Sequence, residues 1–219
     1  MGEMKVPADR LWAAQTQRSH ENFEIGVGIE TMPAEIIHAF GVLKKAAAIT
    51  NNYLKPEKMT DEKLGALKLA CDEVMSGELN GHFPLVVWQT GSGTQSNMNS
   101  NEVIANRSNQ ILGKKLLHPN DDVNMSQSSN DTFPTAMHIA AVIALEDKLI
   151  PAVEELIATF IRLEAENEGI VKSGRTHLQD ATPITFSQEI SGWRSSLQKD
   201  VELIKRSIEP LYELALGGT

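Results

Sequence analysis

Apolar residues recur at intervals of three and four along two stretches in the first third of the chain. Between Pro33 and Leu54 they are Ile36, Ile37, Phe40, Leu43 and Ala47. The second stretch opens at Thr60, which can cap a helix with the acids that follow it, and its apolar residues are Leu64, Leu67, Cys71 and Val74. This spacing predicts two helices that face the core of a compact first domain.

Beyond Asp131 the same spacing extends over longer distances. One apolar stripe comprises Ile139, Val142, Ile143, Leu149, Ile150, Val153, Leu156, Ile157 and Phe160, and Pro151 marks a break or kink in it. After a polar loop at residues 173–183, a second stripe comprises Phe186, Ile190, Trp193, Leu197, Val201, Ile204, Ile208 and Leu211. Long helices joined by one loop predict a bundle in which they pack lengthwise.

The expected fold class is therefore mainly α. We expect a small mixed, mostly helical N-terminal domain at residues 1–127. The first long helices of a central helical bundle follow it at residues 128–219. Two helices cannot bury both apolar stripes alone, so we expect partner chains, further sequence, or both to supply the remaining helices.

The segment between the two regions is polar, and its densest patch is Gly91–Asn101. Glycines let the backbone approach a ligand, and Ser92, Thr94, Asn97 and Asn99 offer neutral donors. A helix beginning just after Thr94 would add free N–H groups that favour a carboxylate. An ordinary capped turn explains the pattern equally well.

Two other polar segments carry candidate chemistry. His118–Asp131 contains a histidine after Lys114 and Lys115, together with more hydroxyls and amides than a helix cap at Asn130 or Asp131 requires. The loop at residues 173–183 contains His177, which can exchange a proton near neutral pH. A solvated basic turn, an idle exposed histidine and a structural ion pair between Arg175 and Asp180 are the alternatives.

The composition excludes several classes of protein. A net charge of −9 and a pI near 5.2 disfavour binding to nucleic acid or to an anionic membrane surface. Cys71 is the single cysteine, no apolar run approaches a membrane span, and the N-terminus lacks a signal-peptide core. No metal-binding motif occurs. We expect a soluble, cytoplasmic protein without a structural metal.

Five motifs, in order, resemble the fumarase/aspartase superfamily, and class II fumarases most closely. They are Leu11–Ser19 (LWAAQTQRS), Gly91–Asn99 (GSGTQSNMN), His118–Asp121 (HPND), Ser128–Asp131 (SSND) and Gly174–Asp180 (GRTHLQD). Together they cover nearly the whole chain. Aspartases resemble this pattern but have Gln at the position of His177, and they lack a match to His118–Pro119. The resemblance to the ammonia-lyase branch is therefore weaker.

The resemblance implies a fumarate hydratase of the tricarboxylic acid cycle, which adds water to fumarate to give L-malate without a cofactor. It also implies a homotetramer whose active sites are shared between subunits. The residue expected to act as the proton donor or acceptor is His177. Residues expected to bind the substrate are Ser92, Gly93, Thr94, Asn97, Ser128, Ser129, Asn130 and Thr176. Those expected at a second anion site are Lys115, His118, Pro119, Asn120 and Asp121.

One family feature does not occur in these residues. The Gly-Ser-Ser-x-Met-Pro-x-Lys-x-Asn loop, whose serine resembles the base that removes the carbon-bound proton, is absent. We therefore expect this stretch alone to be inactive, and to continue beyond Thr219. The alternative functions are another superfamily lyase, acting on aspartate or argininosuccinate, and a non-catalytic truncated domain.

Overall fold

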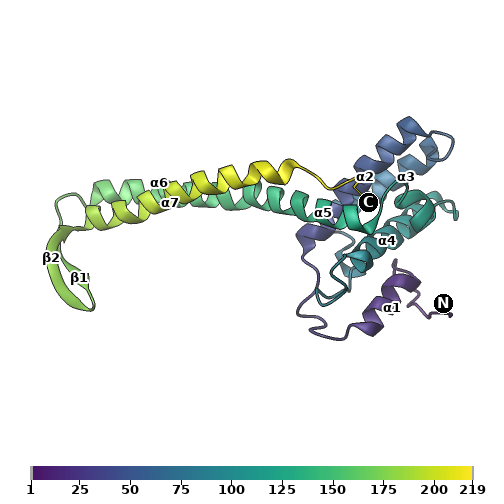
Figure 1. Cartoon of the computed structure of the whole chain (residues 1–219), viewed down its shortest axis with the longest axis horizontal. Coiled ribbons are helices and arrows are strands. Elements are labelled where there is room, and N and C mark those ends of the chain that lie inside the picture. The colour runs from purple at the N-terminus through teal and green to yellow at the C-terminus, as the bar shows by residue number, and fades with distance from the viewer. Residues whose placement is uncertain (1, 219) are drawn as a thin grey trace. The chain divides into compact units, whose positions relative to one another are not determined.

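The computed structural model describes residues 2–218, which form two compact units (Figure 1). The first unit runs up to Ala141 and includes the tail from Leu214, and the second comprises residues 142–213. Helices predominate, so the mainly α fold class is confirmed. The units divide within α5, whereas the domain boundary expected at residues 127 and 128 stays a prediction. No helix among the described residues is long and apolar enough to cross a bilayer.

The first unit consists of helices joined by irregular polar segments. Its elements are α1 (Ala14–Asn22), α2 (Ala34–Leu54), α3 (Asp61–Ser76), the 3-10 helix η1 (Asn80–His82), α4 (Thr94–Leu112), the π-helix η2 (Pro119–Val123) and α5 (Ser129–Ala144). The two helices expected from the apolar spacing are α2 and α3. The Thr60 hydroxyl accepts a hydrogen bond from the backbone N–H of Lys63 at 3.4 Å, as expected of a helix cap.

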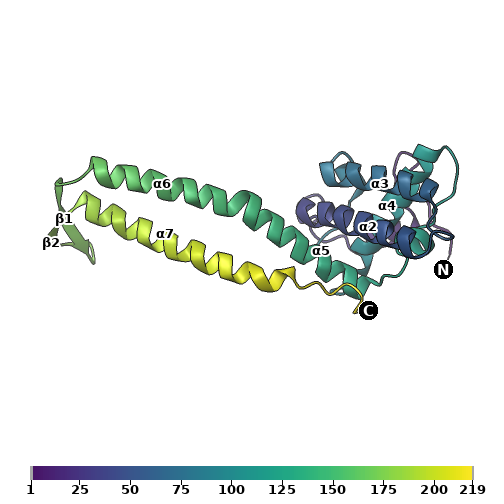
Figure 2. The same cartoon turned by 90° about the horizontal axis from the view of Figure 1, so that it is seen from above.

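The core of the first unit lies around α3, which packs against both α2 and α4 (Figure 2). Leu67 and Val74 of α3 and Ile104 of α4 are fully buried there. A second apolar cluster joins Phe40 of α2 to Ala136 of α5. Burying these side chains is the main favourable contribution to the folding of the unit.

A buried carboxylate attaches α1 to this core. Glu102 of α4 is 3% exposed. Its carboxylate accepts hydrogen bonds from the backbone N–H groups of Ala13, Gln15 and Thr16 at 2.9–3.1 Å, and from the Thr16 hydroxyl at 2.6 Å. These N–H groups lie at the positive end of the α1 dipole, which favours a negative charge. Glu102 therefore caps a helix that lies 86 or more residues away in the sequence.

The second unit is a helical hairpin whose far end carries a β-hairpin. Its elements are the π-helix η3 (Leu145–Leu149), α6 (Ile150–Glu166), β1 (Val171–Thr176), β2 (Gln179–Thr185), α7 (Phe186–Ile208) and the 3-10 helix η4 (Glu209–Tyr212). Figures 1 and 2 both show α6 and α7 side by side. Pro151 lies in the first turn of α6, consistent with the expected break.

The α6–α7 pair buries only part of its apolar surface. Ile150 and Ile157 of α6 meet Val201 and Ile208 of α7 in its core. Other large apolar side chains of these helices are 43–60% exposed, namely Leu156, Ile161, Trp193 and Leu203. Two helices bury one stripe between them and leave the flanking positions open, as the sequence analysis expected.

The polar segment at residues 173–183 is a β-hairpin, so the expectation of a loop was wrong. β1 and β2 pair in antiparallel register, with Arg175 opposite Asp180 and Thr176 opposite Gln179. Most residues of both strands are exposed, and Gly174 is the one buried residue of the two strands. The segment has no buried face and therefore no alternation of apolar and polar residues, which is the pattern that reveals a strand in a sequence.

Replacing Glu102 with Gln should release the start of α1. The side chain of Gln has an NH2 group in place of one carboxylate oxygen, and this group cannot accept hydrogen bonds from the backbone N–H groups of α1. The negative charge that the helix dipole favours would also be lost. We expect the amides of Gln15 and Thr16 to lose protection from hydrogen exchange, by about 2–3 kcal/mol. The matched control is Glu57→Gln, which removes the same charge from an exposed position. Equal protection in both variants would contradict the capping role.

Candidate substrate-binding and catalytic segments

The first candidate segment turns sharply at Gly93 to enter α4. Gly93 has φ +70° and is the N-cap of the helix, so it offers no side-chain cap. The backbone N–H groups of Thr94 and Gln95 consequently lack an acceptor within the helix. The exposed hydroxyls of Ser92 and Thr94 lie 3.1 Å apart at the same place. Free N–H groups and neutral hydroxyls at a helix N-terminus are suited to a carboxylate.

Gly93 also brings this segment against the start of α5. A Cβ atom added to Gly93 would lie 2.0 Å from Cγ of Phe133, so no other residue fits without moving the ring. Phe133 lies on α5, three residues after Asn130. The first candidate segment therefore packs beside the helix that begins with the second.

The second candidate segment, Ser128–Asn130, forms the start of α5. The carboxylate of Asp131 accepts a hydrogen bond from the backbone N–H of Ser128 at 2.9 Å and another from Gly217 at 3.0 Å. Asp131 therefore fills the capping role considered for it or Asn130. The hydroxyls of Ser128 and Ser129 and the amide of Asn130 have no partner among the residues that the structure describes, which leaves them available to a ligand.

Asn97 lies behind the first segment rather than at its surface. It is 1% exposed, its side-chain oxygen accepts a hydrogen bond from Lys44 Nζ at 2.7 Å, and its amide nitrogen donates to Asn124 at 3.1 Å. Both polar atoms are used inside the protein. The binding role expected of Asn97 stays a prediction, and the geometry suits an indirect role.

Lys44 is a residue that the sequence analysis missed. It lies one helical turn from Phe40 and from Ala48, both buried on α2, and is itself 1% exposed. A lysine on the apolar face of a helix is the signal in the sequence that could have revealed it. Burial lowers its pKa to about 7, although the nearby Cys71 and Asp131 oppose that shift.

The third candidate segment is the tip of the β-hairpin in the second unit. His177 and Leu178 form its two-residue turn, with φ +49° and +62°. The hydroxyl of Thr176 lies 3.0 Å from Nδ1 of His177, and Nε2 has no partner among residues 2–218. Arg175 and Asp180 form the ion pair that the sequence suggested, at 2.9 Å. The turn thus presents one imidazole, already oriented by a neighbouring hydroxyl, to the solvent.

The segment considered for a second anion lies at η2. Asp121 lies 3.2 Å from Nδ1 of the exposed His118, and Lys114 pairs with Glu62 at 2.6 Å. Two of the expected positive charges therefore have acidic partners. Lys115 and Asn120 are exposed beside them. Whether this segment binds an anion stays a prediction.

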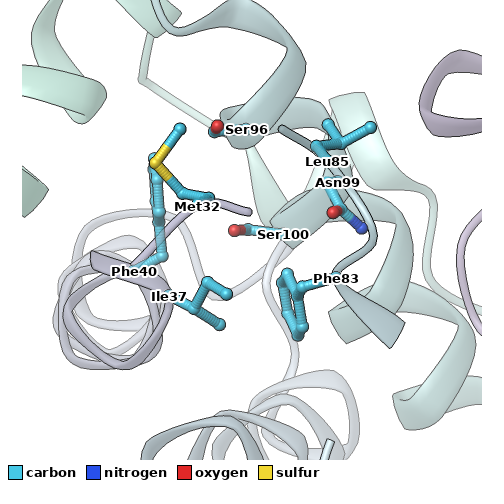
Figure 3. Close-up of a pocket in the computed structure, with 8 residues that line it drawn as sticks. All are labelled: Met32, Ile37, Phe40, Phe83, Leu85, Ser96, Asn99 and Ser100. Atoms are coloured by element: carbon cyan, nitrogen blue, oxygen red, sulfur yellow. The ribbon is translucent and has the colours of Figure 1, made fainter. Parts of the chain in front are cut away.

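A small cavity lies behind α4 and is unsuited to a substrate (Figure 3). Its volume is about 10 Å³, enough for the centre of one water molecule. Figure 3 shows the Ser100 hydroxyl, which has no partner among the described residues, pointing toward its middle. Within residues 2–218 no three acidic, histidine or cysteine side chains gather as a metal site would require.

Comparison with known proteins places these segments in a family. The family model described as Lyase matches residues 2–219. The class II fumarate hydratases of Bacillus cereus and Campylobacter jejuni are 60% and 58% identical to the chain over all of it, which corresponds to 47% and 48% of their own lengths.

Solved structures agree with the sequence comparison. The class II fumarase of Schistosoma mansoni superposes with a TM-score of 0.93 at 42% identity, covering 100% of this chain and 46% of that one. A fumarate lyase:delta crystallin from Brucella melitensis gives 0.91 at 38% identity, covering 99% and 49%. The chain spans about half the length of the relatives it matches. It belongs to this lyase family, and along its whole length it is similar to the N-terminal part of class II fumarate hydratases.

Proposed function

We propose that the protein carrying this sequence is a fumarate hydratase, which interconverts fumarate and L-malate. The observation that carries the proposal is the identity of 56–60% to class II fumarate hydratases over the entire chain. The neutral donors of the first two segments and the exposed imidazole of the third support it, because the reaction needs carboxylate binding and proton transfer.

The dicarboxylate is held by neutral groups. The Ser92 and Thr94 hydroxyls, the α4 N-terminus and the hydroxyls of Ser128 and Ser129 donate hydrogen bonds without an ion pair. Dehydration of malate removes a proton from the carbon beside one carboxylate, and negative charge accumulates on that carboxylate. Donors that are already oriented stabilise this charge without reorganising, and so lower the barrier.

His177 supplies the proton for the leaving hydroxyl. In the dehydration direction its imidazolium protonates the hydroxyl as the carbon–oxygen bond breaks, and water departs. In the hydration direction the neutral ring removes a proton from the attacking water. The carbon-bound proton goes to another base. The resemblance assigns that role to a serine loop whose pattern does not occur in these 219 residues.

We also propose that the intact protein is a homotetramer in the cytoplasm, where it serves the tricarboxylic acid cycle. The exposed apolar side chains along α6 and α7 support assembly, because further helices must cover them in water. The hairpin tip supports shared active sites, because a solvent-exposed catalytic histidine needs other segments to enclose its substrate.

The direct test is the change in fumarate absorbance when the intact purified protein receives L-malate. We expect turnover with malate, and none when aspartate or argininosuccinate replaces it. Fumarate release from aspartate or argininosuccinate would instead assign the protein to another branch of the family.

Replacing His177 with Asn in the intact protein should lower turnover by about a hundredfold or more, the usual scale for losing a general acid or base. Asn accepts positive φ, so the turn at +49° should persist and the melting temperature should change little. Turnover within a few fold of the parent protein would contradict the catalytic role. If the melting temperature of the variant fell so far that unfolding accounts for the lost turnover, the role of His177 would be structural.

Replacing His118 with Asn tests the separation of the two histidines. Its ring contacts Asp121 in the first unit, whereas His177 lies in the second. We expect turnover to stay within a few fold of the parent protein. Weak binding of a dicarboxylate at this segment, measured in the chain by NMR titration, should decrease in this variant and with added salt. Collapse of turnover with the fold preserved would show that the roles of the two histidines are reversed.

A further inference from the structure

Lys44 uses all of its hydrogen-bonding capacity inside the first unit. Its Nζ donates to the side-chain oxygens of Asn97 at 2.7 Å, Gln127 at 2.9 Å and Asn124 at 3.0 Å. An ammonium group has three N–H donors and no acceptor, so three amide oxygens satisfy it completely. A buried charge persists in a protein only when it is satisfied in this way.

One of the three acceptors lies in the first turn of α4, and the other two lie directly before the second candidate segment. Asn97 is the fourth residue of α4, in the turn that Thr94 begins, while Asn124 and Gln127 precede Ser128. Asn124 connects the two sides, since its oxygen accepts from Asn97 at 3.1 Å and its nitrogen donates to the Gln127 carbonyl at 3.2 Å. Lys44 Nζ therefore connects the first turn of α4 to residues 124–127 through hydrogen bonds inside the protein.

We infer that Lys44 is a positioning residue, whose ammonium fixes the first turn of α4 and the approach to Ser128 relative to each other. It does not touch the substrate, because it is almost fully buried and its donors are occupied. That these segments bind carboxylates rests on the proposed function, whereas the contacts that Lys44 makes do not.

The protonation state of Lys44 controls this arrangement. With a pKa of about 7, the ammonium loses a proton as the pH rises through neutrality. The neutral amine has two donors and a lone pair, so one of the three oxygens loses its hydrogen bond to Lys44. The ionisable groups that face Lys44 are Cys71 on α3 and Asp131 on α5, and α4 and residues 124–127 present amides. Burial raises the pKa of the Cys71 thiol, so it stays neutral, and Asp131 supplies the opposing charge.

As the pH rises, the contribution of Lys44 to the free energy of unfolding increases, whereas the order of the two segments decreases. The folded pKa of about 7 lies below the ordinary value of 10.5. Between these values the unfolded chain binds more protons than the folded chain, so this group's contribution to stability rises with pH. Loosening of the two segments over the same range therefore cannot be attributed to a general loss of stability through Lys44.

The experiment is hydrogen exchange on the whole chain, in which Lys44→Met is compared with Lys45→Met. Lys45 is adjacent on α2 and pairs only with Asp72 of α3, at 2.5 Å. In Lys44→Met we expect residues 94–101 and 124–131 to exchange about tenfold faster or more, as for the loss of a hydrogen bond to a charged group. α6 and α7 should be unchanged, and Lys45→Met should resemble the parent chain. Faster exchange in only one segment, or in neither, would overturn the inference.

A second measurement needs no variant at position 44 and applies even if Lys44→Met fails to fold. After correction for intrinsic exchange rates, residues 94–101 and 124–131 of the parent chain should lose protection together between pH 6 and pH 8.5. The Lys45→Met variant should show the same pH dependence as the parent chain. Protection that is independent of pH, or that changes in one segment only, would overturn the inference. Neither measurement uses turnover, so the absence of fumarate hydratase activity would refute the proposed function without altering this result.

Discussion

The first unit depends on satisfying the polar side chains that are buried along α4. The helix contributes Val103 and Ile104 to the apolar core, but most of its buried residues are Ser, Asn and Glu. In a water-free interior each of these groups costs free energy unless it is hydrogen-bonded. The chain meets this requirement for most of these groups by bringing irregular backbone and polar side chains to the helix, whereas Ser100 Oγ and Asn101 Oδ1 have no partner among the described residues.

Particular contacts show how α4 organises its surroundings. Glu102 binds the first N–H groups of α1, and the Asn99 amide donates to the His82 carbonyl at 3.1 Å. Asn106 donates to the Leu11 carbonyl at 2.7 Å, and Asn109 both donates to and accepts from the backbone at Leu117. Side-chain amides can satisfy a carbonyl and an N–H together, so Asn suits the faces of α4 that meet irregular backbone. The Lys44 network belongs to the same pattern.

The sequence predicted those parts of the fold in which burial is periodic. The stripes in α2, α3, α6 and α7 have one apolar face, and their helices were located from spacing alone. The β-hairpin could not be found in this way, because it has no buried face in the chain. The contacts that hold the polar segment around Gly91–Asn101 could not be predicted, since partners such as Glu102 and Thr16 are 86 residues apart.

The candidate site shows the same limit. Its exposed hydroxyls and His177 are visible in the sequence because their types and order carry the chemistry. The sequence shows Lys44 only as a lysine on the apolar face of a helix, whereas its hydrogen bonds to three amides depend on the fold. The burial of Asn97, which is 1% exposed, could not be predicted, because the sequence shows which groups a segment contains but not which way they point.

The placement of positive charge follows from the acidity of the protein. With a net charge of −9, the field at the surface repels a dicarboxylate, so attraction must be local. A cation within the binding segment would be strongly hydrated in the empty site, and its desolvation would oppose binding. The α4 N-terminus supplies partial positive charge without that cost. When Lys44 is protonated it adds a charge behind the same turn, and that charge is already desolvated in the folded protein. Because the charge is buried at low dielectric, salt screens it less than a charge at the surface. Under the proposed function, these groups would attract a dianion to the first two candidate segments without a lysine or arginine in contact with it.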